Sequence, residues 1–155
     1  MKLVQRLAAA LILVAIAGCT QFSGVKPVYP SVGNHHSPPV VDSLQPTLSW
    51  EPMRGVTSYD LIIYQGVKTE SFARGTKRSV GPEVYYRQGL TGTSHKVEIT
   101  LKPSQEYYWS VRGRDGNKVT RWSLYDYSLF LGLGYVSFHN QPFLFVTPAA
   151  PPAQQ

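Results

Sequence analysis

Apolar side chains alternate with polar ones in short runs from Pro46 onward, with a period of two residues rather than the roughly 3.6 of an α-helix. This alternation puts the apolar side chains on one face of each extended strand, and that face must be covered by another layer. Gly, Pro, Asn and Asp separate the runs, as turns between strands require. We expect strands at 47–50, 59–64, 84–90, 97–101, 107–113 and 142–147, with a polar connection over 66–81. The pattern predicts an all-β domain.

Three groups of residues in this region resemble the fibronectin type III domain. The groups are Leu48-x-Trp50-x-Pro52 with Tyr59, Leu101-x-Pro103-x-x-x-Tyr107-x-x-x-Val111-x-Gly113, and Asp115-Gly116 with Trp122-Ser123. They occur in the order of strands B and C, the E–F corner with strand F, and the F–G region of that family. The resemblance implies a fibronectin type III or immunoglobulin-like β-sandwich over 46–148. It also implies that Trp50 lies in the core, and that the buried Tyr107 has its hydroxyl bonded to upstream backbone.

The first 18 residues have the parts of a secretory signal. Lys2 and Arg6 form a short basic head, and residues 7–17 are an unbroken apolar run of 11 residues. A helix needs about 20 apolar residues to span a bilayer, so this run is too short for a membrane anchor. We expect residues 1–18 to be a signal peptide that is removed from the mature chain.

The end of this signal, Ile16-Ala17-Gly18-Cys19, resembles the lipobox of bacterial lipoproteins. The resemblance implies cleavage before Cys19 and a diacylglyceryl group in thioether linkage on its sulfur, with no other cofactor. Cys19 is the single cysteine of the chain, so no disulfide can form within it. In the lipoprotein family an Asp after the cysteine retains the protein in the inner membrane. Thr20 therefore implies the outer membrane, facing the periplasm or the cell surface.

The segment between this cysteine and the predicted sandwich is rich in proline. Residues 19–45 contain Pro27, Pro30, Pro38 and Pro39, and we expect them to form a flexible tether. His35 and His36 lie here without further ligand residues nearby, so a solvated loop is favoured over a metal site. Residues 149–155 are a Pro/Ala/Gln tail.

Charge and motifs exclude several classes of function. Lys2 and Arg6 belong to the expected signal, which leaves 13 basic and 9 acidic residues in the mature chain, a net charge of +4. The basic residues are scattered rather than clustered on one element, so we expect no nucleic-acid partner. The sequence has no nucleophile elbow, zinc-binding helix, phosphate-binding glycine loop or cysteine–histidine cluster, so we do not expect an enzyme.

One segment is longer than the fibronectin type III fold requires. Residues 124–139 are rich in aromatic and aliphatic side chains, with Asp126 as their only charge. Gly132 and Gly134 can turn the segment into a hairpin, which either packs on the sandwich or exposes an apolar patch to a protein or a membrane surface. The candidate contact residues are Tyr125, Tyr127, Phe130 and Tyr135.

A second candidate surface is the outward face of the predicted sheet. In the expected register Tyr64, Tyr108 and Arg112 point away from the core, near Tyr85 or Tyr86. Tyrosine and arginine are common at protein interfaces, and aromatic faces also stack on sugars. We expect a non-catalytic protein-binding or assembly module held on the cell envelope by a lipid anchor. A glycan-binding lipoprotein is the alternative, and an envelope hydrolase is a remote one.

Overall fold

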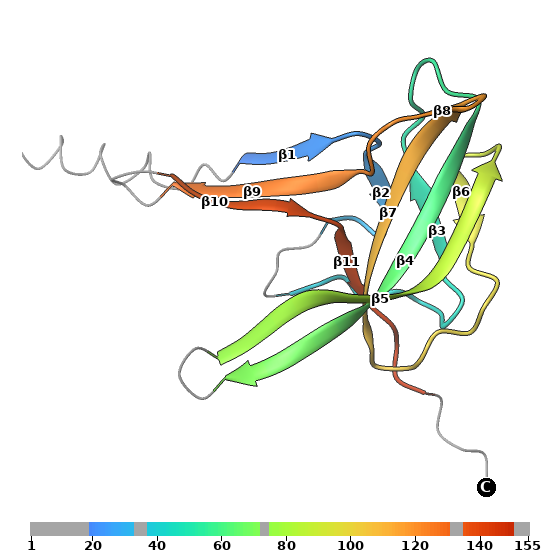
Figure 1. Cartoon of the computed structure of the whole chain (residues 1–155). Helices are drawn as coiled ribbons and strands as arrows, with labels where there is room; N and C mark the ends of the chain where they lie inside the picture. Colours follow the sequence, from blue (N-terminus) through green and yellow to red (C-terminus); the bar gives the residue numbers. More distant parts are fainter. Residues whose placement is uncertain (1–18, 33–36, 72–74, 131–134, 151–155) are drawn as a thin grey trace, which may run out of the picture.

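The computed structural model describes residues 19–32, 37–71, 75–130 and 135–150, and all regular structure in these ranges is β-strand (Figure 1). The strands are β1 (Cys19–Ser23), β2 (Pro27–Tyr29), β3 (Thr47–Trp50), β4 (Ser58–Ser71), β5 (Gly75–Leu90), β6 (Ser94–Lys96), β7 (Glu106–Asp115), β8 (Lys118–Val119), β9 (Leu124–Phe130), β10 (Tyr135–Gln141) and β11 (Phe143–Val146). The prediction of an all-β fold is confirmed. The described ranges contain no helix that could cross a membrane.

The strands form three antiparallel sheets, two of which make a sandwich. One sheet has the order β2-β3-β6, and another has the order β11-β7-β4-β5, with β8 also paired to β7. A single core cluster takes Leu48 and Trp50 from the first sheet and Leu61, Trp109 and Val111 from the second. These two sheets therefore face each other across one hydrophobic core, as alternating strands require.

Aromatic side chains fill much of this core. Trp50 is 2 % exposed and meets Tyr59 edge to face, with ring centroids 5.5 Å apart. Trp109 is fully buried and meets Phe143 in the same manner at 5.2 Å. Such edge-to-face pairs add about 0.5–1.5 kcal/mol beyond the burial of their area. The expected core position of Trp50 is confirmed.

The chain turns a corner before β7, and Tyr107 fixes it. The ring of Tyr107 is buried, and its hydroxyl oxygen accepts a hydrogen bond from the backbone N–H of Lys102 at 2.9 Å. This part-buried contact satisfies a backbone donor of the turn and holds the turn against the start of the strand. The predicted role of Tyr107 is therefore confirmed.

The connection expected over 66–81 is instead the far half of a long hairpin formed by β4 and β5, which extends beyond the sandwich (Figure 1). Register places Lys68 opposite Arg78, and both cations bind the buried carboxylate of Glu106, at 3.0 and 3.1 Å. Sequence alternation missed these strands because neither face of the hairpin is apolar. Backbone pairing and the shared ion pair hold it together.

A second strand was misplaced by its apolar alternation. The strand expected at 97–101 is wrong, since β6 lies at Ser94–Lys96 and the chain bends afterwards. Val97 and Leu101 are buried, and their N–H groups bond to carbonyl oxygens of Pro46 and Leu44, both at 2.9 Å. Two buried residues on either side of a bend thus gave the sequence the same apolar spacing as one face of a strand.

The segment expected to be a tether is largely part of the fold. β1 and β2 lie within residues 19–45, and each pairs with a strand of the domain. Val25 and Val41 are 2 % and 1 % exposed and belong to the core cluster. The ordered domain therefore begins well before residue 46. His35 and His36 lie outside the described residues.

The inserted segment divides the edge strand of the second sheet. β8 and the backbone N–H groups of Thr120 and Ser123 bond to β7, the chain then leaves as the β9–β10 hairpin, and β11 resumes pairing with β7. β1 joins the free edge of β9 to make a third sheet, ordered β1-β9-β10. This three-stranded sheet, called the arm below, projects from the sandwich (Figure 1). The predicted hairpin is confirmed.

Candidate functional site

The arm carries Cys19, the residue at which the sequence predicts lipid attachment. β1 begins at Cys19, whose register partner on β9 is Ser128, and it ends at Ser23 opposite Leu124, near the sandwich. β9 and β10 continue past Cys19 and pair Leu129 with Val136 and Phe130 with Tyr135. The candidates Tyr127, Phe130 and Tyr135 thus lie on the strands of the arm. Their side chains are outside the described part of the structure.

Ser123 fixes the base of the arm. Its side chain is fully buried, and its Oγ accepts a hydrogen bond from the N–H of Val25 at 2.7 Å. Its carbonyl oxygen accepts a bond from the hydroxyl of Ser110 at 2.6 Å. Gly24 has a φ of +89°, and a Cβ built there would lie 2.9 Å from Ser123 Oγ. Glycine is therefore required where β1 leaves the sandwich.

Tyr125 belongs to the core and does not form part of an exposed surface. It is 4 % exposed, and its ring stacks on Phe143 with centroids 6.2 Å apart. Burial, with a smaller contribution from the nearby Tyr108, raises the pKa of Tyr125 to about 12. The expectation that Tyr125 lies on an exposed contact surface is therefore wrong, and its position shows that the hairpin packs on the sandwich.

Tyr108 is also buried. It lies on the expected face of β7, opposite to Trp109, but it is 1 % exposed. Its register neighbours are Tyr64 on β4 and Leu144 on β11. Burial raises the pKa of Tyr108, and the carboxylate of Glu106 raises it further. The outward surface predicted for Tyr108 is therefore wrong, because neighbouring side chains cover this part of the face.

Tyr64 is partly buried on the same face. Burial raises the pKa of its hydroxyl, and the carboxylate of Glu83, its register partner on β5, raises it further.

Arg112, the third residue of that predicted surface, lies in a cluster built around Asp60. Asp60 is fully buried and binds Arg112 Nε at 2.9 Å and Arg114 Nη2 at 2.7 Å. The guanidinium of Arg112 lies 4.4 Å from the ring centroid of Trp122, a cation–π contact. Trp122 in turn meets Tyr86 edge to face at 6.4 Å. We call Arg112, Trp122 and Tyr86, which are all partly exposed, the Trp122 patch.

The charge of Asp60 holds this patch in place. Burial alone would raise the pKa of the Asp60 carboxyl, but hydrogen bonds from Arg114, Arg112 and the N–H of Gly89 outweigh burial and lower it. Asp60 therefore stays ionised near neutral pH and fixes both guanidinium groups. The partly exposed Trp122 ring is therefore packed against Arg112, and the buried Asp60 fixes the position of that arginine.

Sequence reasoning missed three members of this cluster. Trp122 was noted only as part of a turn region, and Asp60 and Arg114 were not singled out. Asp60 lies between the apolar residues Tyr59 and Leu61. In an alternating strand, a polar side chain at this position is expected to face solvent. One signal in the sequence did point to a buried acidic partner. Another strand carries two arginines on the same face, Arg112 and Arg114.

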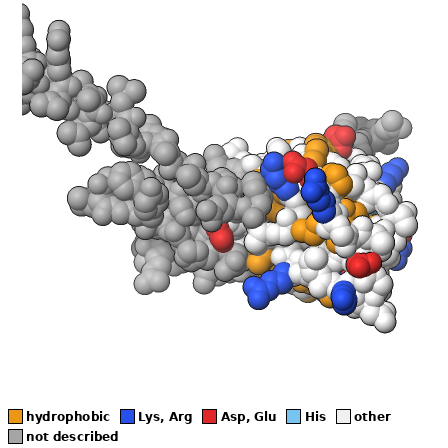
Figure 2. All heavy atoms as spheres, turned by 90° about the horizontal axis from the view of Figure 1, so that it is seen from above, with side chains coloured by type: hydrophobic (Ala, Val, Ile, Leu, Met, Phe, Trp, Pro, Cys, Tyr) orange, Lys and Arg blue, Asp and Glu red, His pale blue; other side chains and the backbone are white. Residues whose placement is uncertain are grey.

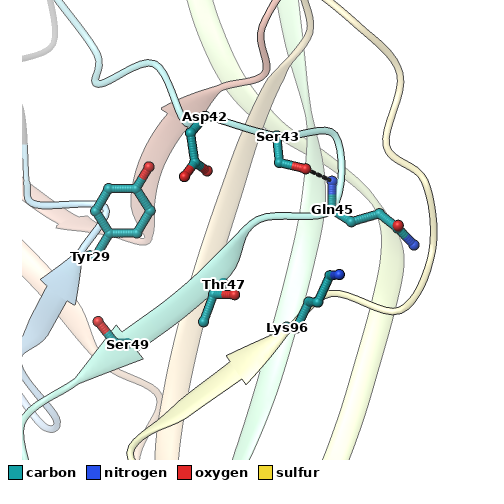
Figure 3. Close-up of a pocket in the computed structure, with 7 residues that line it drawn as sticks. All are labelled: Tyr29, Asp42, Ser43, Gln45, Thr47, Ser49 and Lys96. Carbon is teal, nitrogen blue, oxygen red and sulfur yellow. Dashed lines mark hydrogen bonds between the residues drawn. The ribbon is translucent and has the colours of Figure 1, made fainter.

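The opposite sheet carries an open polar groove of about 580 Å³ (Figure 3). Its lining comes from β2, β3, β6 and the loop before β3, and consists of Tyr29, Asp42, Ser43, Gln45, Thr47, Ser49 and Lys96. Ser43 Oγ accepts a hydrogen bond from the N–H of Gln45 at 3.0 Å, so this loop is fixed by its own side chain. The groove mixes one acidic and one basic group and concentrates neither charge.

Charges are interspersed on the visible surface as well. On the face drawn in Figure 2, Lys and Arg side chains alternate with Asp and Glu, and hydrophobic groups show between them. Within the described residues no group of three or more His, Cys, Asp or Glu side chains is placed to hold a metal ion.

No protein-family model, curated protein or solved structure matches the chain.

Proposed function

We propose that this chain is a bacterial envelope lipoprotein whose β-sandwich is a non-catalytic protein-binding module. The observation that carries the proposal is the run Ile16-Ala17-Gly18-Cys19 after an 11-residue apolar segment. The first described strand begins at Cys19. In this proposal the signal is cut before Cys19, and its sulfur carries a diacylglyceryl group. Two or more acyl chains anchor a protein stably, at about 0.8 kcal/mol for each buried CH₂. Thr20 favours the outer membrane.

We further propose that the sandwich is of the fibronectin type III kind. If β3, β4 and β7 are strands B, C and F, as the sequence resemblance assigns them, the two sheets read A–B–E and G–F–C–C′. That grouping of seven strands is typical of the family. The hydroxyl of Tyr107 on the backbone of Lys102 adds the corner contact of such sandwiches.

The proposed contact surface is the Trp122 patch. Tryptophan, tyrosine and arginine are the residue types that most often dominate binding energy at protein interfaces. Arg112 is held by the buried Asp60, so little side-chain freedom remains to be lost on binding. A protein partner is favoured over a glycan, because the burial of Tyr108 removes one of the two tyrosines proposed for sugar stacking.

A non-catalytic role agrees with the state of the two buried carboxylates. Asp60 is paired with Arg112 and Arg114, and Glu106 is paired with Lys68 and Arg78. Burial raises the pKa of Asp60, but the hydrogen bonds from Arg114 and Arg112 outweigh burial and lower it, so this carboxylate is a poor proton acceptor near neutral pH.

Metabolic labelling tests the anchor. Cells that express the chain are grown with labelled palmitate, and label is followed in the wild-type chain and in Cys19→Ser. We expect label in the wild type and none in the variant. Equal labelling of the two would remove the lipoprotein proposal.

Photo-cross-linking in intact cells tests the contact surface. A photoreactive phenylalanine at Trp122 is compared with the same residue at Tyr29, which is 37 % exposed on the opposite sheet. We expect one discrete cross-linked protein from position 122 and none from position 29. Identical or absent products at both positions would contradict the assignment of the patch.

A further inference from the structure

The two hairpins that project from the sandwich differ in chemistry at their ends. On β4 and β5 the paired residues toward the turn are Lys68 with Arg78, Thr69 with Lys77 and Glu70 with Thr76. On β9 and β10 the corresponding pairs are Leu129 with Val136 and Phe130 with Tyr135. The first hairpin has the polar sequence expected for strands surrounded by water. The second has an apolar sequence at the position farthest from the core.

Register places this apolar end directly beyond the lipid attachment point. Cys19 pairs with Ser128, so Leu129 and Phe130 on β9 lie past it, away from the base of the arm at Ser123. Two further residues of antiparallel strand extend about 7 Å. That length matches the depth of roughly 5–10 Å to which interfacial protein segments enter a bilayer.

We infer that the end of the arm formed by Leu129, Phe130, Tyr135 and Val136 is a second membrane contact, which enters the lipid headgroup region beside the acylated Cys19. This inference rests on the proposed lipid anchor. Acyl chains on Cys19 bring its strand to the bilayer surface, and the pairing of β1 with β9 brings the apolar end of the hairpin with it. Tyr135 is of the residue type that is enriched where protein meets the membrane–water interface.

The open edges of the arm limit the depth of insertion. In the order β1-β9-β10 the two outer strands each have one edge unpaired within the described residues. Unpaired backbone N–H and C=O groups are strongly disfavoured in the hydrocarbon core, whereas headgroups and water satisfy them at the interface. The arm therefore stops at the interface. The two contacts would fix the angle at which the sandwich stands on the membrane, which a single flexible lipid anchor could not do.

A single introduced thiol can report the depth of the arm. The wild-type chain has one cysteine, and lipid consumes its sulfur, so any introduced cysteine is the only free thiol of the mature protein. We would prepare the full lipidated chain with Phe130→Cys, and separately with its register partner Tyr135→Cys. Two variants are used so that a folding defect in one does not decide the result. The controls are Ser23→Cys at the base of the arm and Ser79→Cys on β5, both at exposed positions.

Each variant is mixed with vesicles of phosphatidylethanolamine and phosphatidylglycerol and floated on a density gradient. The floated protein is then treated with a membrane-impermeant maleimide, and parallel samples carry an environment-sensitive fluorophore with brominated lipids present. We expect positions 130 and 135 to react at least about tenfold more slowly than positions 23 and 79, and to be quenched by brominated lipid.

The possible outcomes distinguish a failure of the membrane contact from a failure of the proposed lipid anchor. If the chain floats but positions 130 and 135 react as fast as position 79, the membrane contact is refuted and the lipid anchor stands. Slow reaction without quenching by brominated lipid would place these positions against protein and would also refute the contact. If the wild-type chain fails to float, the lipoprotein proposal itself is wrong, and the inference is refuted with it.

Discussion

Replacing Asp60 by Asn should destabilise the sandwich strongly, although the two side chains have nearly the same shape. Oδ1 of Asp60 accepts hydrogen bonds from Arg114 Nε at 3.0 Å and Gly89 N at 3.2 Å. Oδ2 accepts bonds from Arg112 Nε at 2.9 Å and Arg114 Nη2 at 2.7 Å. An amide supplies one oxygen and one NH₂ group, so two of these four bonds are lost and donors then face donors.

The expected loss in the free energy of unfolding is about 3 kcal/mol. Removing one partner of a buried ion pair typically costs about 3–5 kcal/mol. The side chains of Arg112 and Arg114 are 21 % and 17 % exposed, so water can solvate them in part once the charge is gone. This favours the lower end of the range. A domain of this size is stable by only about 5–15 kcal/mol, so the change should be plain in a denaturation curve.

Urea unfolding at neutral pH, followed by circular dichroism, measures this loss. The matched control is Glu51→Gln, which removes a carboxylate whose ion pair with Lys26 is 50 % and 51 % exposed at its two ends. Exposed pairs contribute about 0–1 kcal/mol, so Glu51→Gln should leave the free energy of unfolding nearly unchanged. A loss for Asp60→Asn no larger than that of the control would refute the claim that Asp60 organises this face.

The pH dependence of stability gives an independent check on Asp60. Its pKa is lowered in the folded state, so its contribution is fully present above the unfolded value of about 3.9 and is lost as the pH falls through the folded pKa. The wild type should therefore lose more stability than Asp60→Asn during acidification below about pH 4. Parallel curves for the two proteins would contradict the role of the charge.

Three further predictions address the corner, the base of the arm and His95. Tyr107→Phe leaves the N–H of Lys102 without its partner and should lower the free energy of unfolding in urea by about 0.5–1.5 kcal/mol; an unchanged midpoint would contradict the corner contact. Gly24→Ala places a Cβ 2.9 Å from Ser123 Oγ at a positive φ, and should speed hydrogen exchange in β1 while the core strands are unaffected; unchanged exchange in β1 would count against this anchoring. Burial lowers the pKa of His95, so stability should fall as the pH drops below about 6.5, and His95→Gln should remove that slope.

Sequence alternation predicted the strands whose one face is buried in the core. The run Thr47–Trp50 coincides with β3, and the run over 107–113 lies inside β7. Alternation failed in two situations. Some strands pair without burying an apolar face, and some residues are buried without belonging to a strand. The β4–β5 hairpin pairs without an apolar face, and Val97 and Leu101 are buried without a strand between them. The prolines around Val25 and Val41 favoured a flexible tether, so the sequence did not predict that these two residues lie in the core.

The candidate sites were predicted less well, because exposure depends on contacts between distant segments. Tyr108 and Tyr125 alternate correctly along their strands, but other parts of the chain cover both. Nothing local in the sequence shows that Trp122 would contact Arg112, since the contact depends on the pairing of residues 120–123 with β7. The pairing of Cys19 with Ser128 likewise joins two segments more than a hundred residues apart in the sequence.

Mass spectrometry of the mature N-terminus tests the central claim most directly. The protein is purified from envelope membranes, digested, and its first peptide is sequenced. The proposal predicts a peptide that begins at Cys19 and carries the mass of a thioether-linked diacylglyceryl group. A mature chain that begins at any other residue, or with an unmodified Cys19, would contradict the lipid anchor and the membrane contact inferred from it.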